Sequence, residues 1–191
     1  MQAEEVIERF KRTGALLEGH FILSSGLHSP VYLQCALVLQ HPAEAEAFGR
    51  ALARKFPGQS IETVASPAIG GLIIGYEVAR ALGARFIWTE RDAAGQMTLR
   101  RGFTIRPGES VLVIEDVITT GGSTRETIEA LVSAGARIVG AASIIDRSAG
   151  RADVGLARHA LATLEVPSVA PTSCEACARG EQAIKPGSRK Q

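Results

Sequence analysis

The chain is predicted to fold as an α/β domain built on a mostly parallel sheet that is flanked by helices. Short apolar segments such as residues 111–114, rich in β-branched side chains, predict strands that are buried on both faces. These segments alternate with stretches whose apolar residues recur at helical spacing, the pattern of parallel strands joined by helices. The chain has 191 residues, 46% of them hydrophobic, enough for one core with a small appendage. We therefore expect a single domain over residues 1–191.

The N-terminal part is expected to form one helix and then a small sheet outside the main core. Residues 3–13 form an amphipathic pattern whose apolar face carries Val6 and Phe10. In residues 16–34, glycines and Pro30 separate short apolar pieces, which favours a small irregular sheet. On these residues alone, a surface hairpin is the simplest interpretation.

The remaining elements follow the alternation of strand and helix. A helix over 42–55 is expected to begin at Pro42, followed by a strand over 61–65 and a helix over 72–82. Strands are expected over 85–89 and 111–114, and the second of these leads into a helix that ends near Gly135. A strand over 137–145 and an edge strand over 160–166 complete the set. Residues 90–103 interrupt this rhythm, and Gly95 is placed to turn a hairpin there.

Two carboxylates and a glycine-rich turn follow the strand over 111–114. Glu115 and Asp116 stand where that strand is expected to end, and the turn with its threonines and glycines leads into a helix. Backbone N–H groups at a helix start bind anions, while carboxylates accept hydrogen bonds from the hydroxyls of a vicinal diol. The segment therefore predicts a site for a ribose 5-phosphate group. The alternative is an ordinary strand–turn–helix with a polar tip; a P-loop is disfavoured because its lysine is missing.

Two further sites are predicted at strand ends. Residues 66–71 form a second strand–glycine turn–helix, which is either another anion cradle or a tight connection. Asp146 and Arg147 follow the strand over 137–145, at the edge of a parallel sheet where ligands bind. A structural ion pair is the alternative there.

Composition and charge exclude several classes of function. A net charge of +1 gives no reason to expect nucleic acid or a membrane as the main partner. No apolar run approaches a membrane span, and the N-terminal residues lack the hydrophobic core of a signal peptide, so a cytoplasmic enzyme is expected. The three cysteines do not suggest a disulfide framework. Cys174 and Cys177 form a single C-x-x-C without a second such pair, so a turn with reduced cysteines is favoured over a metal site, although a dimer would bring four cysteines together.

The segment over 111–124 resembles the phosphoribosyl pyrophosphate (PRPP) motif of the type I phosphoribosyltransferases: four hydrophobic residues, two acids and a Thr/Gly/Ser-rich loop. The resemblance implies that PRPP is bound, that Mg²⁺ is held mainly through PRPP rather than by protein side chains, and that ribosyl phosphate is transferred to a nitrogen base. The residues that it assigns to PRPP are Glu115, Asp116, Val117, Ile118, Thr119, Thr120, Gly121, Gly122, Ser123, Ala68, Ile69, Gly70 and Arg91. Of these, Asp116, Glu115 and Arg91 are assigned the catalytic role.

The stretch from Phe21 to Pro30 is similar to the hood of the orotate phosphoribosyltransferases, and the tail resembles a short, Thermus-type group of that family. This resemblance implies a hood over about 1–35, a core over about 36–170, a tail over 171–191 and a homodimer. The residues that it assigns to orotate are Thr119, Arg147, Ser24, Ser25 and Gly26. Ser24 stands where the best-known members have a lysine.

The resemblance makes two predictions about loops near the site. The family's pyrophosphate loop carries a non-proline cis peptide, expected here near Ala68–Ile69, and some members have a lysine where Gly70 stands. The family also has a mobile loop over about 90–103 that carries lysines and a histidine. This chain has only arginines there, and Arg100 and Arg101 are either substitutes for those lysines or solvated charges.

Two rival functions remain. A type I transferase for a purine base would share the PRPP motif, but a neutral purine gives no reason for a carboxylate-binding arginine at position 147. A non-enzymatic PRPP-sensing regulator would be expected to add a basic, nucleic-acid-binding surface, and the sequence has no basic stripe.

Overall fold

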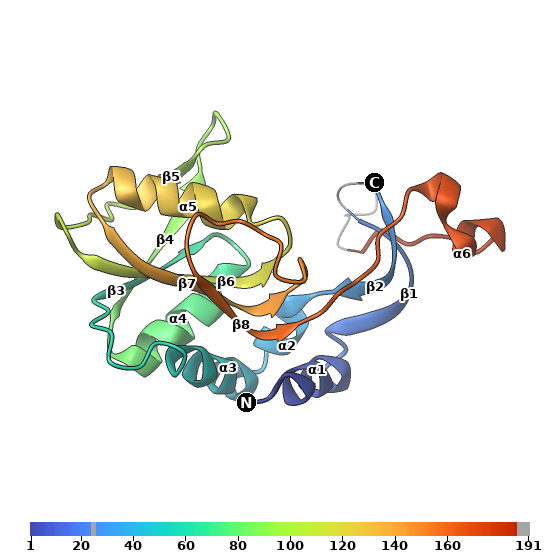
Figure 1. Ribbon diagram of the computed structural model, residues 1–191, viewed down its shortest axis with the longest axis horizontal. Helices are drawn as coiled ribbons and strands as arrows, with labels where there is room; N and C mark the ends of the chain where they lie inside the picture. Colours follow the sequence, from blue (N-terminus) through green and yellow to red (C-terminus); the bar gives the residue numbers. More distant parts are fainter. Residues whose placement is uncertain (24–25, 187–191) are drawn as a thin grey trace.

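A six-stranded sheet forms the centre of the molecule. The structure is a computed structural model that describes residues 1–23 and 26–186. The strands of this sheet are β3 (Thr63–Pro67), β4 (Arg85–Arg91), β5 (Met97–Leu99), β6 (Ser110–Ile118), β7 (Arg137–Asp146) and β8 (Arg158–Thr163). Their order is β5-β4-β3-β6-β7-β8 (Figure 1), and every neighbouring pair is parallel except β4 and β5. The predicted mostly parallel sheet is confirmed, with β8 at an edge.

Helices cover both faces of this sheet because the central strand buries side chains on both sides. In β6, Leu112 and Ile114 belong to the apolar cluster that includes α3 (Pro42–Ala53) and α4 (Gly71–Leu82). Val111 and Val113 point the other way, into the cluster under α5 (Gly122–Ser133). Each such side chain contributes roughly 1.5–3 kcal/mol when it is fully buried. The β6–α5 unit is thereby fixed in the middle of the sheet.

The first helix, α1 (Ala3–Arg12), packs on the core as its apolar face predicts. Val6 and Phe10 are fully buried, and the Phe10 ring lies 5.9 Å from the ring of Phe48 in α3. A short helix that was not expected, α2 (Cys35–Leu39), follows the small sheet and leads to Pro42. With five residues, and only Gln40 and His41 between it and α3, this helix is too short for a clear periodic pattern in the sequence.

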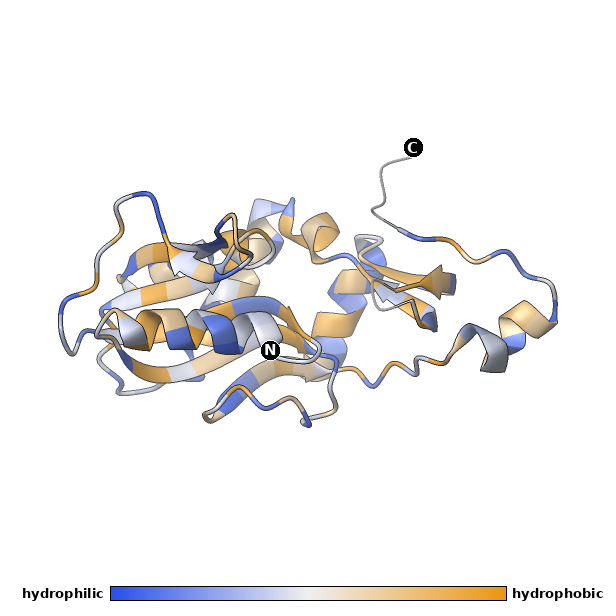
Figure 2. Ribbon diagram, turned by 90° about the horizontal axis from the view of Figure 1, so that it is seen from above, coloured by the Kyte–Doolittle hydropathy of each residue, from blue (hydrophilic) through white to orange (hydrophobic). Residues whose placement is uncertain are grey.

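A small sheet, here called the hood sheet, stands apart from the α/β core. It pairs β1 (Leu16–Ile22) with β2 (His28–Leu33) in antiparallel fashion, with a register shift between Glu18 and Phe21. The C-terminal segment, with the 3₁₀ turn η1 (Pro171–Ser173) and the helix α6 (Glu175–Ala178), lies beside it at the same end of the molecule (Figure 2). Backbone bridges at Val169 and Ile184 attach this segment to the hood sheet.

One boundary differs from the prediction in a way that matters for the site. Strand β6 does not end before the acids but continues through Glu115 and Asp116 to Ile118. The reason is its neighbour β7, with which Glu115, Val117 and Ile118 are still in register. The acids are therefore held by the sheet rather than by a loop.

The helices are short throughout residues 1–23 and 26–186. Among them, none is long and apolar enough to cross a membrane.

Candidate active site

The turn after β6 is shaped as a cradle for an anion. A cavity of about 150 Å³ is lined by residues between Glu115 and Thr124. Gly121, which precedes α5, has a φ of +81°. A Cβ there would lie 2.9 Å from Cγ1 of Val154, so both the backbone and the packing require glycine. Thr119 and Thr120 are exposed at the mouth, beside the N–H groups of the helix start.

The two acids lie side by side at the end of the buried strand. Glu115 is only 8% exposed, and burial, followed by the neighbouring Asp116, raises the pKa of its carboxyl well above the usual range. The backbone N–H groups of Asp116 and Val117 donate to Oε1 of Glu115 at 3.2 Å and to Oδ1 of Asp116 at 2.8 Å. These acceptors have further capacity for the hydroxyls of a sugar.

The second glycine turn lies directly against the acids. The peptide bond between Ala68 and Ile69 is cis, as predicted. A Cβ on Gly70 would lie 2.8 Å from Oδ1 of Asp116, and one on Gly71 would lie 3.2 Å from Oε1 of Glu115. The sheet thus brings both predicted cradles together around one pair of carboxylates.

Arg147 lies at the same edge of the sheet, where its backbone N–H donates to the carbonyl of Ile118 at 2.8 Å. Its side chain is half-buried, and its Nε is buried without a hydrogen-bond partner among the described residues. Burial lowers the pKa of this guanidinium, while the nearby Cys35 and Tyr32 raise it. An unpartnered donor on a partly desolvated cation is a binding group for a planar anion.

Asp146 does not pair with Arg147, so the ion-pair alternative for this dipeptide is wrong. The Asp146 carboxylate is 2% exposed and pairs with Nη1 of Arg158 at 2.8 Å. Burial alone would raise the pKa of Asp146, but hydrogen bonds from Ser148 and Arg158 lower it instead. Because the Asp146 carboxylate pairs with Arg158, it does not occupy the guanidinium of Arg147.

Cys35 is a component of the site that the sequence did not reveal. Its buried thiol faces the Asp116 carboxylate and also lies near Arg147. Burial, followed by Asp116, raises the pKa of this thiol well above its usual value, so it is a neutral donor. A lone cysteine in the apolar stretch 35–39 carries no signal of this role.

The predicted residues of the hood are only partly placed. Ser24 and Ser25 lie outside the described residues. Gly26 lies exposed at the hairpin tip with a φ of +82°, and its N–H donates to the carbonyl of Leu23 at 2.9 Å.

The three arginines of the segment after β4 contact neighbouring acids. Gly95 turns a hairpin between β4 and β5, as predicted. Arg91 pairs with Glu126 of α5 at 2.7 Å rather than with the acids of β6. Arg101 contacts Glu90 at 2.7 Å and Arg100 lies 3.9 Å from it. The Arg101 guanidinium, with Trp88, lowers the pKa of Glu90 to about 2.

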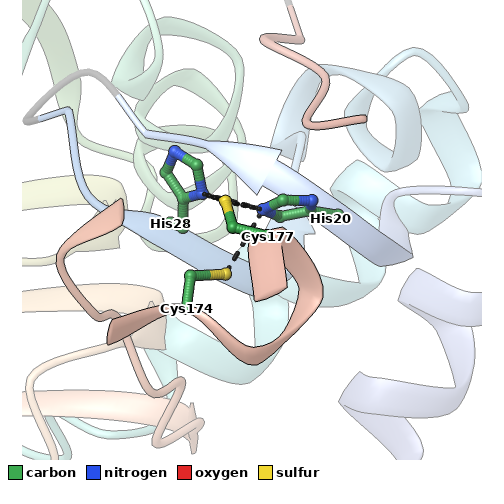
Figure 3. Close-up of side chains that lie close together, drawn as sticks. All are labelled: His20, His28, Cys174 and Cys177. Atoms are coloured by element: carbon green, nitrogen blue, oxygen red, sulfur yellow. Dashed lines mark hydrogen bonds between the residues drawn. The ribbon is translucent and has the colours of Figure 1, made fainter. Parts of the chain in front are cut away.

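The described residues contain a second cluster of reactive side chains, away from the acids and in the hood. The C-x-x-C motif of the tail does not stand alone, because His20 and His28 lie beside Cys174 and Cys177 (Figure 3). The sequence holds no second C-x-x-C, and the two further side chains of the cluster are histidines. The available signal was this pair of histidines, eight positions apart in the hood segment.

The chain is similar to known proteins over its whole length. A phosphoribosyl transferase domain model matches residues 36–156. Orotate phosphoribosyltransferase of Pelotomaculum thermopropionicum is 55% identical over 190 residues, which cover 100% of both chains. That of Thermus thermophilus is 48% identical over 176 residues, covering 92% of this chain and 96% of its own. The crystal structure of orotate phosphoribosyltransferase from Aeropyrum pernix, at 28% identity, has a TM-score of 0.69 and covers 84% of this chain and 94% of its own. From its sequence, its fold and the cradles around Glu115 and Asp116, the chain belongs to the orotate phosphoribosyltransferase family.

Proposed function

We propose that this protein transfers the 5-phosphoribosyl group of PRPP to orotate, giving orotidine 5′-monophosphate and pyrophosphate for the synthesis of UMP. The observation that carries the proposal is Arg147, a half-buried cation whose Nε has no partner among the described residues, beside a pair of acids between two glycine cradles. A carboxylate-bearing base satisfies that cation, whereas a neutral purine leaves it unpaired in a partly desolvated site.

The PRPP site is assigned to both cradles and the acids between them. Thr119 to Ser123, following Val117 and Ile118, bind the 5′-phosphate through backbone N–H groups and hydroxyls. Glu115 and Asp116 accept hydrogen bonds from the ribose hydroxyls. Ala68, Ile69 and Gly70 give backbone donors to the pyrophosphate, because a side chain at Gly70 would meet Asp116.

The orotate site is assigned to the space between Arg147 and the hood. Arg147 binds the carboxylate of orotate. Thr119, which lines the anion cradle after β6, is also assigned to orotate. Ser24, Ser25 and Gly26 are also assigned to orotate; the two serines lie outside the described residues, and Gly26 is exposed between β1 and β2.

The reaction follows from positioning and electrostatics. The bond between the anomeric carbon and pyrophosphate breaks ahead of strong bonding to the ring nitrogen of orotate. Orotate reacts as the dianion, whose ring nitrogen has already lost its proton to solvent, so the nitrogen lone pair forms the C–N bond while the electron pair of the broken C–O bond leaves with pyrophosphate. Glu115 and Asp116 hold the ribose in place while its ring gains positive charge, and the backbone donors of the cradles stabilise the phosphates. No side chain acts as an obvious general base.

We assign the Mg²⁺ that accompanies PRPP to this site. The ion would be held mainly by the oxygens of PRPP rather than by protein side chains, because Mg²⁺ favours substrate phosphates and because Glu115 and Asp116 are assigned to the ribose hydroxyls. When bound, the ion neutralises charge on the leaving pyrophosphate.

Three further assignments accompany this function. The arginine-bearing segment around Arg91 closes over the site and excludes water. The protein acts as a homodimer in the cytoplasm, and Ile69, Ile73 and Tyr76, which are 83%, 46% and 58% exposed beside the site, favour a covered apolar face. The chain is one domain, with its hood and tail carried on the core.

A panel of bases, each supplied with PRPP and Mg²⁺ and followed by pyrophosphate release, tests the proposal. We expect turnover with orotate and none with adenine, guanine, hypoxanthine, xanthine or uracil. Turnover with a purine would keep the PRPP site and overturn the role of Arg147. Tight PRPP binding without turnover of any base would instead favour a regulator.

A further inference from the structure

We propose that the protein holds one structural Zn²⁺ ion between the hood sheet and the C-terminal segment, with His20, His28, Cys174 and Cys177 as its four ligands. His20 comes from β1 and His28 from β2, while Cys174 directly precedes the short helix α6 and Cys177 lies within it (Figure 3). This site is separate from the PRPP-bound Mg²⁺ and does not depend on the proposed transferase activity.

The geometry of the four side chains is close to that of a tetrahedral zinc site. All four ligand atoms lie within 4.8 Å of one another. Sγ of Cys174 lies 3.3 Å from Nε2 of His20, and Sγ of Cys177 lies 3.3 Å from Nδ1 of His28 and 3.6 Å from Nε2 of His20. Zinc bonds of about 2.05 Å to nitrogen and about 2.3 Å to sulfur place tetrahedral N and S ligands about 3.6 Å apart. These three S···N distances are thus within about 0.3 Å of the ligand-to-ligand distance in a tetrahedral zinc site.

The distance between the two histidine nitrogens has to increase for the ion to enter. Nε2 of His20 and Nδ1 of His28 lie 2.7 Å apart, whereas two zinc-bound nitrogens lie about 3.3 Å apart. A change of about 0.6 Å is within reach of small rotations of the two imidazole rings, whose terminal torsions are broad.

The surroundings orient the ligands as zinc requires. Nδ1 of His20 lies 3.0 Å from the carbonyl oxygen of Glu181, so the proton of a neutral imidazole belongs on Nδ1 and the lone pair of Nε2 faces the cluster. Metal-binding histidines typically have such a partner on the outer nitrogen. His20, His28 and Cys174 are 7%, 7% and 8% exposed, so three of the four ligands are already shielded from water.

The chemistry of the ligands selects zinc among common cations. Two thiolates and two imidazoles in a tetrahedral arrangement suit Zn²⁺, whereas Mg²⁺ and Ca²⁺ take oxygen ligands. The C-x-x-C spacing is the usual one for half of such a site. With four protein ligands the coordination is complete, which indicates a structural rather than a catalytic ion.

The hood explains why such an ion is useful. An isolated two-stranded sheet is marginally stable, and the hood sheet lies outside the main core. Among the described residues, the tail pairs with the hood sheet through isolated backbone bridges, at His28 with Val169 and at Phe21 with Ile184, and forms no further strand of that sheet. A metal that joins β1, β2 and the tail supplies the stability that a small apolar core does not.

Metal analysis of the purified full-length chain tests the site. We expect about one zinc per chain after dialysis. The Co²⁺-substituted protein should show the visible bands of a tetrahedral ion and a thiolate-to-cobalt charge-transfer band. Cys174→Ser and His28→Ala should each lose the metal and these bands. Cys35→Ser and His41→Ala, which change a cysteine and a histidine outside the cluster, should keep both.

The structural consequence is tested by hydrogen exchange with and without zinc. Removal of the metal should speed exchange in 16–33 and 165–186 by tenfold or more and leave β6 unchanged. The proposal is overturned if the wild-type chain, supplied with Zn²⁺ or Co²⁺ under reducing conditions, binds neither. It is also overturned if the cobalt bands persist in Cys174→Ser. Because metal binding and hydrogen exchange are measured on the wild-type chain, misfolding of a variant does not by itself decide the outcome.

Discussion

Arg147 is the residue to which we assign the choice of base. Replacing it with alanine should raise KM for orotate roughly 10- to 100-fold, because charged hydrogen bonds to a carboxylate contribute about 1.5–3 kcal/mol. KM for PRPP should stay within about threefold, since the acids and cradles are untouched. Initial rates with each substrate varied in turn measure both. Arg151→Ala removes an exposed arginine nearby and should change neither. Equal losses for both substrates would contradict the assignment.

Glu115 illustrates a conflict between stability and function. The pKa of its carboxyl is raised in the folded protein, so the folded state holds the proton more tightly than the unfolded state does. The free energy of unfolding therefore falls as pH rises from about 4.5 through that raised pKa, because the carboxylate must then ionise in a buried place beside Asp116. Glu115→Gln should therefore stabilise the protein at neutral pH by on the order of 1 kcal/mol and impair PRPP use roughly tenfold. Thermal unfolding of both proteins across this pH range checks the sign, because the gap should close toward pH 4. A variant that is less stable at pH 7 would refute it.

Among individual residues, the sequence indicated the site roles of charged residues and glycines better than those of neutral residues. Asp116 and Gly121 have chemistry or backbone freedom that a strand–turn–helix does not require, so they stood out. Cys35 did not, because its place beside Asp116 depends on how α2 is packed rather than on its own neighbours in sequence.

Among the elements, the amino ends of β3, β4 and β6 are joined by the buried Glu109. Its side chain accepts hydrogen bonds from Thr63, from Arg85 and from the backbone N–H of Arg106. Burial alone would raise its pKa, but these partners lower it to about 2. The stabilisation is therefore complete above the unfolded pKa of about 4.5 and is lost as pH falls toward about 2.

Glu109→Gln should cost on the order of 2 kcal/mol at pH 7, with the difference from wild type shrinking at pH 3. Urea unfolding at the two pH values measures it. Glu62→Gln, which changes a neighbouring carboxylate with a side chain 40% exposed, should cost less. Identical midpoints for Glu109→Gln and wild type at pH 7 would rule out this role.

The turn after β5 has an arginine in an unusual backbone conformation. Arg101 has a φ of +59°, which glycine would adopt more readily, and its side chain contacts Glu90. If Arg101 leaves Glu90 to bind phosphate when the segment closes, Arg101→Ala should lower kcat roughly tenfold with little change in Tm, because exposed ion pairs contribute little. Steady-state kinetics and a melting curve test this, with Arg54→Ala as an exposed control. An unchanged kcat would identify Arg101 as a surface charge.

Most elements were predictable because local signals agreed with the tertiary structure. Pro42 begins α3, and Gly135 follows α5 with a φ of +98°. The end of β6 was missed because polar residues normally end a strand, and here pairing with β7 continues through them. Tertiary context determined that boundary, and the sequence of β6 alone does not contain it.

For the molecule as a whole, the exposed apolar residues of α4 predict a dimer. Ile73→Asp together with Tyr76→Asp should convert it to a monomer, because two charges would be buried in the interface. Sedimentation velocity measures the change, and circular dichroism confirms that the fold is kept. Val132→Asp alters an equally exposed apolar residue, on α5, and should leave the dimer intact. A wild-type monomer at micromolar concentration would disprove the expectation.

The largest gap between sequence and structure lies in the hood and tail. His20 and Cys174 are in contact although 154 residues separate them, and no periodicity links segments so far apart. The α/β core could be read from its repeating strand–helix pattern, whereas this contact depends on where the tail returns across the hood sheet.

The ion pair between Asp146 and Arg158 has a consequence for evolution. It completes the end of β7 without the side chain of position 147, so the scaffold and the proposed specificity determinant are carried by different side chains. Replacements at 147 can alter which base is accepted while the strand end remains intact. A descendant enzyme with a new substrate would need no compensating change in this part of the fold, which makes position 147 a natural target for laboratory selection.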